Sequence, residues 1–120
     1  MIQIISPIDN QVIAERPKAG NTELQAAIAK SAEAQKSWQQ TEIQQRAWYC
    51  DKAIDAMLDR QIEIGEELTR QMGRPLRYTP GEIDGLAERG RTMIEFAEAA
   101  LADIPIPPKP GFTRFIRRQP

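Results

Sequence analysis

The spacing of hydrophobic residues changes along the chain from an alternating pattern near the start to a helical one. Residues 2–6 and 11–16 are rich in Ile and Val, and turn-forming residues separate them at 7–11. This arrangement predicts a β-hairpin. The stretch PKAGN at 17–21 then favours a loop directly after the hairpin.

Three amphipathic helices are predicted after the hairpin, because apolar residues recur there at intervals of three and four. The apolar face of the first comprises Leu24, Ala27, Ile28, Ala34 and Trp38. The second is predicted as one long helix over about 41–72, with a stripe of Ile43, Ala47, Cys50, Ile54, Met57, Leu58, Ile64 and Leu68. The third begins near 79 and presents Ile83, Leu86, Gly90, Met93, Ile94, Ala97 and Leu101.

The same start signal, Thr followed three residues later by Gln or Glu, precedes each predicted helix. The pairs are Thr22–Gln25, Thr41–Gln44 and Thr79–Glu82. This spacing is typical of a capping box, in which the two side chains bond to free backbone N–H groups. Gly65 inside the long helix is expected to loosen or kink it. Gly73 and Pro75 are expected to end it.

The last part of the sequence combines a proline-rich stretch with a segment of strand character. IPIPPKPG at 104–111 has four prolines in eight residues, which favours an extended, polyproline-like connector. GFTRFIRRQP at 111–120 predicts a β-strand at 112–118 with aromatic and cationic side chains. No later strand is present to pair with it, so we expect an unpaired edge that requires a partner outside this sequence.

Composition narrows the function classes. Charged residues make up 28% of the chain and the net charge is −1, so nucleic acid and anionic membranes are not expected as partners. Histidine is absent, which removes the commonest acid–base residue near neutral pH. With a single cysteine, no membrane-length apolar run and no signal-peptide pattern, a cytoplasmic location is the expectation.

Two conspicuous residue types are interpreted as structural. Cys50 lies on the stripe of the long helix and has no histidine to activate it, so a buried, unreactive thiol is predicted. Trp38 lies on an apolar helix face, and we interpret it as packed between helices rather than as a ligand platform. The residues themselves therefore predict a helical scaffold with a hairpin and an extended arm, and no set that could carry a reaction.

Four stretches in order nevertheless resemble a known family. They are ISPIDNQVIAERP, AIAKSAEAQKSWQQTEIQQRA, ELTRQMGRP and IPIPPKPGFTRFIRRQP. They are similar to the opening hairpin, the next helix, the E-x-G-K-P helix end, and the connector and R-x-x-P strand of NAD(P)-dependent aldehyde dehydrogenases. The resemblance implies an α/β parent enzyme, of which this chain is a mostly helical N-terminal portion. Residues 1–103 would be the hairpin and helices of the cofactor-domain region, and 104–120 the connector and oligomerisation arm.

A parent enzyme of this family would oxidise an aldehyde to a carboxylic acid with NAD or NADP, as a homo-oligomer. The nucleophilic cysteine, the general base and the cofactor phosphate site come later in family sequences. The resemblance therefore implies no catalytic and no cofactor-binding residue in this chain, and no cofactor bound by it alone. We expect an inactive fragment, cut short before the catalytic motifs.

Three minor sites also follow from the resemblance. A monovalent cation would bind near the carbonyls of Ile4 and Ile5 and at Gln71, where the family carries a carboxylate. Leu86 would face the aldehyde tunnel, with Ile83 and Gly90 on the same helix face; core packing is the alternative for all three. The oligomerisation arm would comprise Phe112, Arg114, Phe115, Ile116, Arg117 and Arg118.

Two other functions stay open at this point. The chain could be a stand-alone helical interaction module whose C-terminal strand pairs with a partner's sheet. Its helices would then expose apolar residues suited to an absent domain, so a sticky, marginal or molten species is expected. The arginines and phenylalanines of the final strand also suit single-stranded nucleic acid, which the acidic balance of the remaining chain disfavours.

Overall fold

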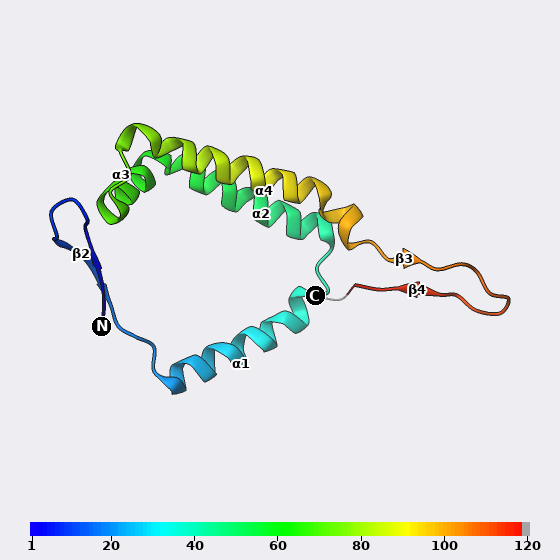
Figure 1. The fold of residues 1–120 in the computed structure, drawn as a ribbon. Coiled ribbons are helices and arrows are strands. Elements are labelled where there is room, and N and C mark those ends of the chain that lie inside the picture. The colour runs from blue at the N-terminus through cyan, green and yellow to red at the C-terminus, as the bar shows by residue number, and fades with distance from the viewer. Residues whose placement is uncertain (119–120) are drawn as a thin grey trace.

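The computed structural model describes residues 1–118, which form two small hairpins joined by four helices (Figure 1). In chain order the elements are β1 (Ile2–Ile5), β2 (Val12–Arg16), α1 (Asn21–Trp38), α2 (Ile43–Asp59), α3 (Gln61–Met72), the 3-10 turn η1 (Leu76–Tyr78), α4 (Pro80–Leu101), β3 (Ile104–Pro105) and β4 (Phe115–Ile116). The mostly helical character predicted from the sequence is confirmed.

The N-terminal hairpin is also confirmed. β1 pairs antiparallel with β2, from Ile2 opposite Arg16 onward, and the register shifts between Ile4 and Ile5. At the turn, the Ser6 hydroxyl accepts a hydrogen bond from the Ile8 N–H at 3.2 Å, while Asn10 adopts a left-handed φ of 59°. Asn is one of the few residues that tolerate this conformation, which explains its place in the turn.

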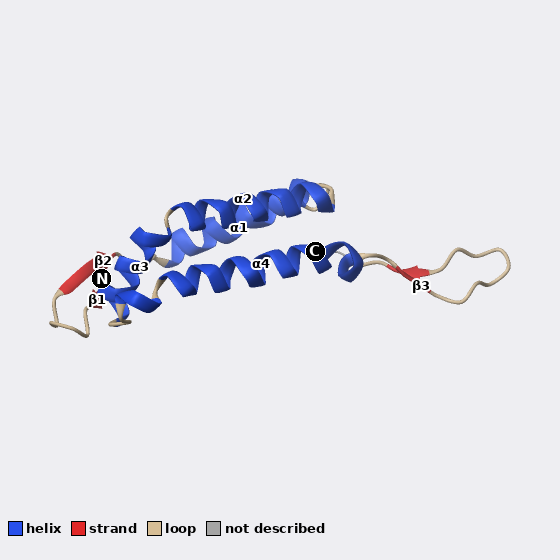
Figure 2. Cartoon of the chain, turned by 90° about the horizontal axis from the view of Figure 1, so that it is seen from above, coloured by secondary structure: helices blue, strands red, loops and turns tan. Residues whose placement is uncertain are grey.

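The small core lies where α2 and α4 pack side by side (Figures 1 and 2). Ile54 of α2 and Ile83 and Ala87 of α4 are its buried hydrophobic residues. Gly90 permits the close approach of the two helices, because a Cβ there would lie 2.6 Å from Ile54 Cδ1. The 3.6-residue pattern thus predicted the helices and the faces on which Ile54 and Ile83 lie.

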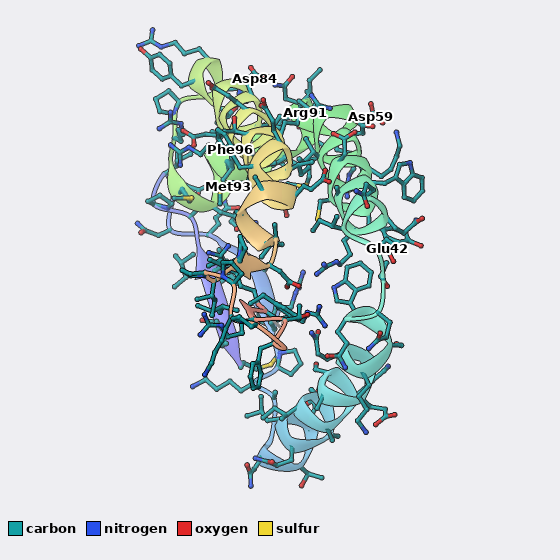
Figure 3. All side chains as sticks on the ribbon, turned by 90° about the vertical axis from the view of Figure 1, so that its right-hand side faces the viewer. Glu42, Asp59, Asp84, Arg91, Met93 and Phe96 are labelled. Carbon is teal, nitrogen blue, oxygen red and sulfur yellow. The ribbon has the colours of Figure 1, made fainter. Side chains whose placement is uncertain are left out.

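An ionic cluster joins the same two helices along their solvent edge. Arg91 of α4 donates from Nη2 to Asp55 Oδ1 at 2.7 Å and from Nε to Asp51 Oδ1 at 3.1 Å. Lys52 donates to the other Asp55 oxygen at 2.8 Å. Figure 3 shows Arg91 on the side of α4 toward α2, and Met93 and Phe96 on the opposite side. Because the partners are exposed, each pair stabilises the fold only modestly.

Acid is expected to weaken this cluster. The hydrogen bond from Lys52, with the nearby Arg91 charge, lowers the pKa of Asp55 below its usual value. The folded pKa then lies below the unfolded pKa of about 3.9, so the stabilisation is complete above that pH and is lost as pH falls through the folded pKa. Asp55→Asn should therefore reduce the loss of stability below about pH 4 in urea titrations. The control is Asp59→Asn, which removes a carboxylate that makes no ion pair within residues 1–118 and should leave that loss unchanged. If the free energy of unfolding fell equally with pH in both variants, the prediction would be contradicted.

The prediction of one long second helix is wrong. The chain breaks at Arg60, with φ −105° and ψ 16°, so that α2 ends at Asp59 and α3 begins at Gln61. No proline or glycine lies at the break. Instead, the Gln61 side-chain amide donates to the Pro80 carbonyl at 3.0 Å and to Asp84 Oδ1 at 2.7 Å, which ties the start of α3 to the start of α4. A tertiary contact, invisible in the local sequence, sets the break.

The capping boxes do not form, since none of the helix N-caps makes a side-chain cap hydrogen bond within residues 1–118. α4 does begin as predicted, with Thr79 as N-cap and Pro80 in the first turn. The Thr79 hydroxyl, however, donates backward to the Leu76 carbonyl at 2.9 Å. Gly65 lies buried inside α3, against Thr79.

The buried position predicted for Cys50 is wrong, and Trp38 packs between helices only in part, against Tyr49 of α2. Cys50 is exposed, and Trp38 keeps 40% of its surface accessible. The cause is the placement of α1, which has no buried residue and runs apart from the α2–α4 pair (Figure 1). On the apolar face of α1, Leu24 and Ile28 are exposed, and Trp38 at its end contacts the Tyr49 ring of α2.

The C-terminal strand has a partner inside the chain, contrary to expectation. β4 pairs antiparallel with β3, placing Ile116 opposite Ile104 and Phe115 opposite Pro105. The connector therefore folds back instead of leading away, with Gly111 at a φ of 77° in the reversal. The Arg117 guanidinium closes the base of the hairpin on Asp103 at 2.9 Å. The strand is shorter than the predicted 112–118, and the last two residues of the R-x-x-P motif, at 119–120, lie outside the described part.

The molecule is elongated rather than compact. Its radius of gyration is 20.9 Å, against about 14 Å for a compact domain of this length. Its accessible surface is 9838 Å², against about 6,600 Å² for a folded monomer of this mass. Much of the excess is apolar, since Met93, Phe96 and Ile62 each keep 60% or more of their surface exposed.

Candidate functional site

A groove of about 790 Å³ lies where α3 crosses the α2–α4 pair. Its lining residues are Met57, Ile64, Leu68, Met72, Arg74, Gly81, Glu82, Ile83, Gly85, Leu86 and Arg89. The wall is mainly apolar, with charged groups from the loop after α3 and from α4. A groove of this size and composition can hold a small organic molecule.

Local sequence explains how the groove is built. Ile64 and Leu68 are four residues apart on α3, so they share one face, and Ile83 and Leu86 do the same at a spacing of three on α4. Gly73 ends α3 in a left-handed conformation with a φ of 71°, as the sequence predicted. The 3-10 turn η1 then carries the chain across to α4, so the two apolar faces meet at an angle and leave the groove open between them.

Three charged residues on the wall differ in their pairing. Arg74 Nη2 lies 2.6 Å from Glu82 Oε1, so these two charges compensate each other. Arg89 makes no ion pair with any residue in the described part of the chain. Neither Arg74 nor Arg89 was predicted from the sequence as a site residue. The signal was available, because Arg89 follows Leu86 by three residues on the same helix face.

Of the three residues that the resemblance assigns to the aldehyde tunnel, two line the groove and one does not. Ile83 and Leu86 both line the groove, Ile83 being 4% and Leu86 40% exposed. Gly90 instead faces Ile54 of α2 and does not line the groove. Ile83 and Gly90 thus also have the packing role that was the alternative for these positions.

The residues suggested for a monovalent cation come from two elements. Ile4 and Ile5 lie in β1 at its register shift, and Gln71 lies in the last turn of α3. The hairpin and the end of α3 are neighbours, because Pro7 Cγ would lie 3.0 Å from a Cβ on Gly73. The donor set is a neutral amide and backbone carbonyls, without a carboxylate to balance a cation's charge. At Gln71 the carboxylate that the family carries is thus replaced by a neutral amide.

The predicted arm residues lie together on the C-terminal hairpin. Phe112, Phe115 and Ile116 keep 64%, 42% and 54% of their surface exposed. The Arg117 guanidinium lies 4.7 Å from the Phe115 ring centre, and Arg114 donates to the Pro107 carbonyl. The hairpin projects from the end of α4, away from the helices (Figure 1).

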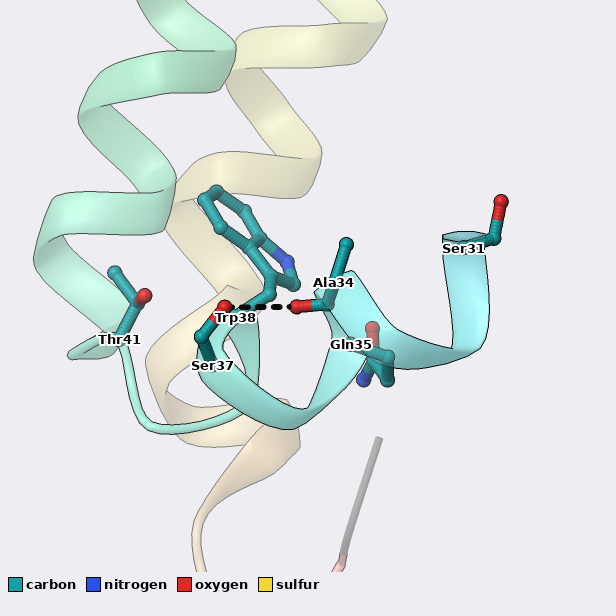
Figure 4. A pocket seen from close by; sticks show the side chains of 6 residues that line it. All are labelled: Ser31, Ala34, Gln35, Ser37, Trp38 and Thr41. Atoms are coloured by element: carbon teal, nitrogen blue, oxygen red, sulfur yellow. Dashed lines mark hydrogen bonds between the residues drawn. The ribbon is translucent and has the colours of Figure 1, made fainter. Parts of the chain in front are cut away.

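A second hollow lies beside Trp38, at the end of α1 (Figure 4). The Ser37 hydroxyl donates to the Ala34 carbonyl at 3.0 Å within it. The Trp38 ring lies 5.8 Å from that of Tyr49, which in turn lies 5.1 Å from that of Trp48. The stacking joins α1 to α2 at this one point, and no charged group lines the hollow to orient a ligand.

No catalytic or metal centre is visible in residues 1–118. The structure there contains no group of three or more His, Cys, Asp or Glu side chains arranged to hold a metal ion. Within the same residues, no helix is both long and apolar enough to cross a membrane.

Comparison with known proteins now identifies the family. The model of the aldehyde dehydrogenase family matches residues 1–120, so the chain belongs to that family. A mitochondrial succinate-semialdehyde dehydrogenase of Arabidopsis thaliana is 30% identical over 107 residues, which cover 89% of this chain and 20% of that protein. Betaine aldehyde dehydrogenase 2 of Rhizobium meliloti is 32% identical over 100 residues, covering 83% and 20%. The chain spans about a fifth of the length of these relatives.

Solved structures share the fold. Succinic semialdehyde dehydrogenase of Streptococcus pyogenes, in complex with NADP+, matches with a TM-score of 0.80 and 19% identity, over 91% of this chain and 24% of that one. A glyceraldehyde-3-phosphate dehydrogenase of Methanocaldococcus jannaschii, complexed with NADP, gives the same TM-score at 16% identity. Over 91% of its length the chain therefore has the fold found in these dehydrogenases. The family predicted from the four sequence stretches is confirmed by the match of the family model.

Proposed function

We propose that residues 1–120 are the N-terminal portion of an enzyme that oxidises an aldehyde to a carboxylic acid with NAD or NADP. The match of the family model along the whole chain carries this proposal. The catalytic cysteine, the general base and the nicotinamide site then belong to sequence beyond these residues. In this enzyme Leu86 and Ile83 form part of the wall along which the aldehyde enters.

The exposed apolar surface supports the same proposal. The exposed apolar face of α1 and the exposed Met93 and Phe96 on α4 are suited to cover by further protein, since soluble monomers rarely leave large apolar patches open. Family membership does not favour the stand-alone interaction module, which would keep these surfaces in water.

The C-terminal hairpin is proposed as the oligomerisation arm, with the apolar Phe112, Phe115 and Ile116 forming the contact and the arginines Arg114, Arg117 and Arg118 bordering it. Interfaces commonly combine an aromatic centre with arginine. We place this homo-oligomeric enzyme in the cytoplasm, because the one cysteine of residues 1–120 gives no sign of a disulfide framework.

NAD(P)H formation from a panel of aldehydes tests the proposed activity. The protein captured from its cells through residues 1–120 should be a homo-oligomer heavier than this chain and should reduce NAD or NADP. The isolated 120-residue chain should give no aldehyde-dependent signal. Turnover by the isolated chain would place the catalytic groups within it, and a captured protein inactive with every aldehyde and both cofactors would overturn the proposal.

A further inference from the structure

We propose that Arg46 of α2 binds a carboxylate side chain of the protein beyond residue 120, in a segment that covers the corner where α1 meets α2. This inference rests on the proposed function, because it requires that residues 1–120 continue into a longer enzyme. It names a residue that joins the two parts of that enzyme, which the proposed function does not identify.

The burial of Arg46 carries the inference. The other arginines and all the lysines of residues 1–118 are exposed, whereas Arg46 is only partly accessible. Its Nε is buried and has no hydrogen-bond partner in this part of the chain, and Arg46 forms no ion pair there. A charge withdrawn from water is normally paired with an opposite charge, because leaving it alone is costly. The counter-charge is therefore expected from outside the described residues.

The carboxylates of the same helix do not supply this counter-charge. Glu42 precedes Arg46 by one helical turn, a spacing that allows ion pairs on a helix surface, yet the two are not paired. Asp51 and Asp55 are bonded to Arg91 of α4 instead. The pairing inside the structure thus leaves Arg46 as a withdrawn and uncompensated cation.

The surroundings of Arg46 have the composition of an interface. Tyr49 follows Arg46 by three residues, so the two share a face of α2. The Tyr49 ring lies 5.8 Å from the Trp38 ring and 5.1 Å from the Trp48 ring, and these three side chains keep 40–51% of their surface exposed. Arginine among aromatic side chains is typical of the centre of a protein interface. Covering these rings would also remove water from Arg46.

The occupant we infer is a segment of the same enzyme, with an acidic side chain among apolar ones. The chain spans about a fifth of the length of its relatives, so the parent enzyme has ample sequence to supply this segment. A carboxylate suits the site better than a backbone carbonyl, because it neutralises the charge and accepts two parallel N–H bonds from the guanidinium. Arg46 does not line the groove, so this contact is separate from the proposed path of the aldehyde.

A crystal structure of the full-length enzyme tests the inference directly. It should place an Asp or Glu oxygen from beyond residue 120 about 3 Å from a guanidinium nitrogen of Arg46. A guanidinium that contacts only water, backbone carbonyls or the aldehyde would overturn the inference. Because this experiment uses the native enzyme, a variant that fails to fold does not remove the test.

Thermal unfolding of the full-length enzyme then tests whether the contact is an ion pair. Arg46→Met keeps the apolar stem but removes the charge, so it leaves the carboxylate buried alone and should lower the unfolding midpoint by several degrees. Replacing that carboxylate with its amide should lower the midpoint of the native enzyme but have little further effect in Arg46→Met, a coupling that a double-mutant cycle measures. Arg46→Lys should lower the midpoint less, because it keeps the charge without the paired donors.

The matched control is Arg70→Met on α3, which removes an exposed arginine that makes no ion pair within residues 1–118. It should leave the midpoint unchanged. Equal midpoints for Arg46→Met and Arg70→Met in an enzyme that oxidises aldehydes would overturn the inference and leave the proposed function standing. A native protein that ends at residue 120 would overturn both, since no further segment would exist to carry the carboxylate.

Discussion

Replacing Ile54 with alanine should lower the free energy of unfolding by about 2–5 kcal/mol, the usual range for truncating a buried isoleucine. Ile54 is 7% exposed and is the core residue that α2 contributes against α4. Its Cδ1 fills the space left by Gly90, so truncation opens a cavity where the two helices approach most closely. In a molecule with so few buried side chains, this change removes a large share of the core. Urea unfolding of the 120-residue chain, followed by helical circular dichroism, measures it.

Ile62→Ala provides the matched control for the same chemical change. Ile62 keeps 76% of its surface exposed on α3, and surface substitutions of this kind shift stability by about 0.5 kcal/mol or less. The expected result is a large shift of the urea midpoint for Ile54→Ala and almost none for Ile62→Ala. Similar shifts of the urea midpoint for both variants would mean that the chain has no α2–α4 core. That result would agree with the molten species that the sequence analysis considered.

The sequence predicted part of this core: Ile54 and Ile83 lie on the predicted faces, whereas buried Ala87 was not on them and Met93, which was, is 72% exposed. Ile54 lies on the apolar stripe predicted for the second helix, and Ile83 on that of the third. Burial of a helix face depends on a pattern that repeats every 3.6 residues, so it can be recognised without knowing the partner. The same pattern predicted that α1 is amphipathic, but it could not tell whether anything covers its apolar face.

The predictions that failed concern features determined by contacts between distant residues. Next to the break at Arg60, Gln61 bonds to Pro80 and Asp84, and in the C-terminal hairpin Arg117 pairs with Asp103. Neither pair is close in sequence. Leu86 and Ile83, which the resemblance assigns to an aldehyde tunnel, both line the groove. Arg89 was missed because an exposed arginine on a helix is common. It stands out only once the structure shows that Arg74, the other arginine of the groove, is paired with Glu82.

Gly65→Ala should destabilise the fold by about 1–3 kcal/mol, although alanine is the better helix former by roughly 1 kcal/mol. The added Cβ would lie 2.6 Å from Thr79 Oγ1 and 3.2 Å from Thr79 Cβ. Thr79 cannot easily move, because it is completely buried and its hydroxyl donates to the Leu76 carbonyl. α3 must therefore move away from the start of α4, or that hydrogen bond must break.

The matched control reverses the sign of this effect. Gly85 also lies inside a helix, but a Cβ there would meet nothing within 4 Å, so Gly85→Ala should stabilise the chain by up to about 1 kcal/mol. Thr79→Ala removes the atom that the new methyl group would strike. Gly65→Ala should therefore cost less in that background than in the native one, a coupling that a double-mutant cycle in urea measures. If Gly65→Ala were as favourable as Gly85→Ala, α3 could not lie against the N-terminus of α4, and the groove between them would lose its geometric basis.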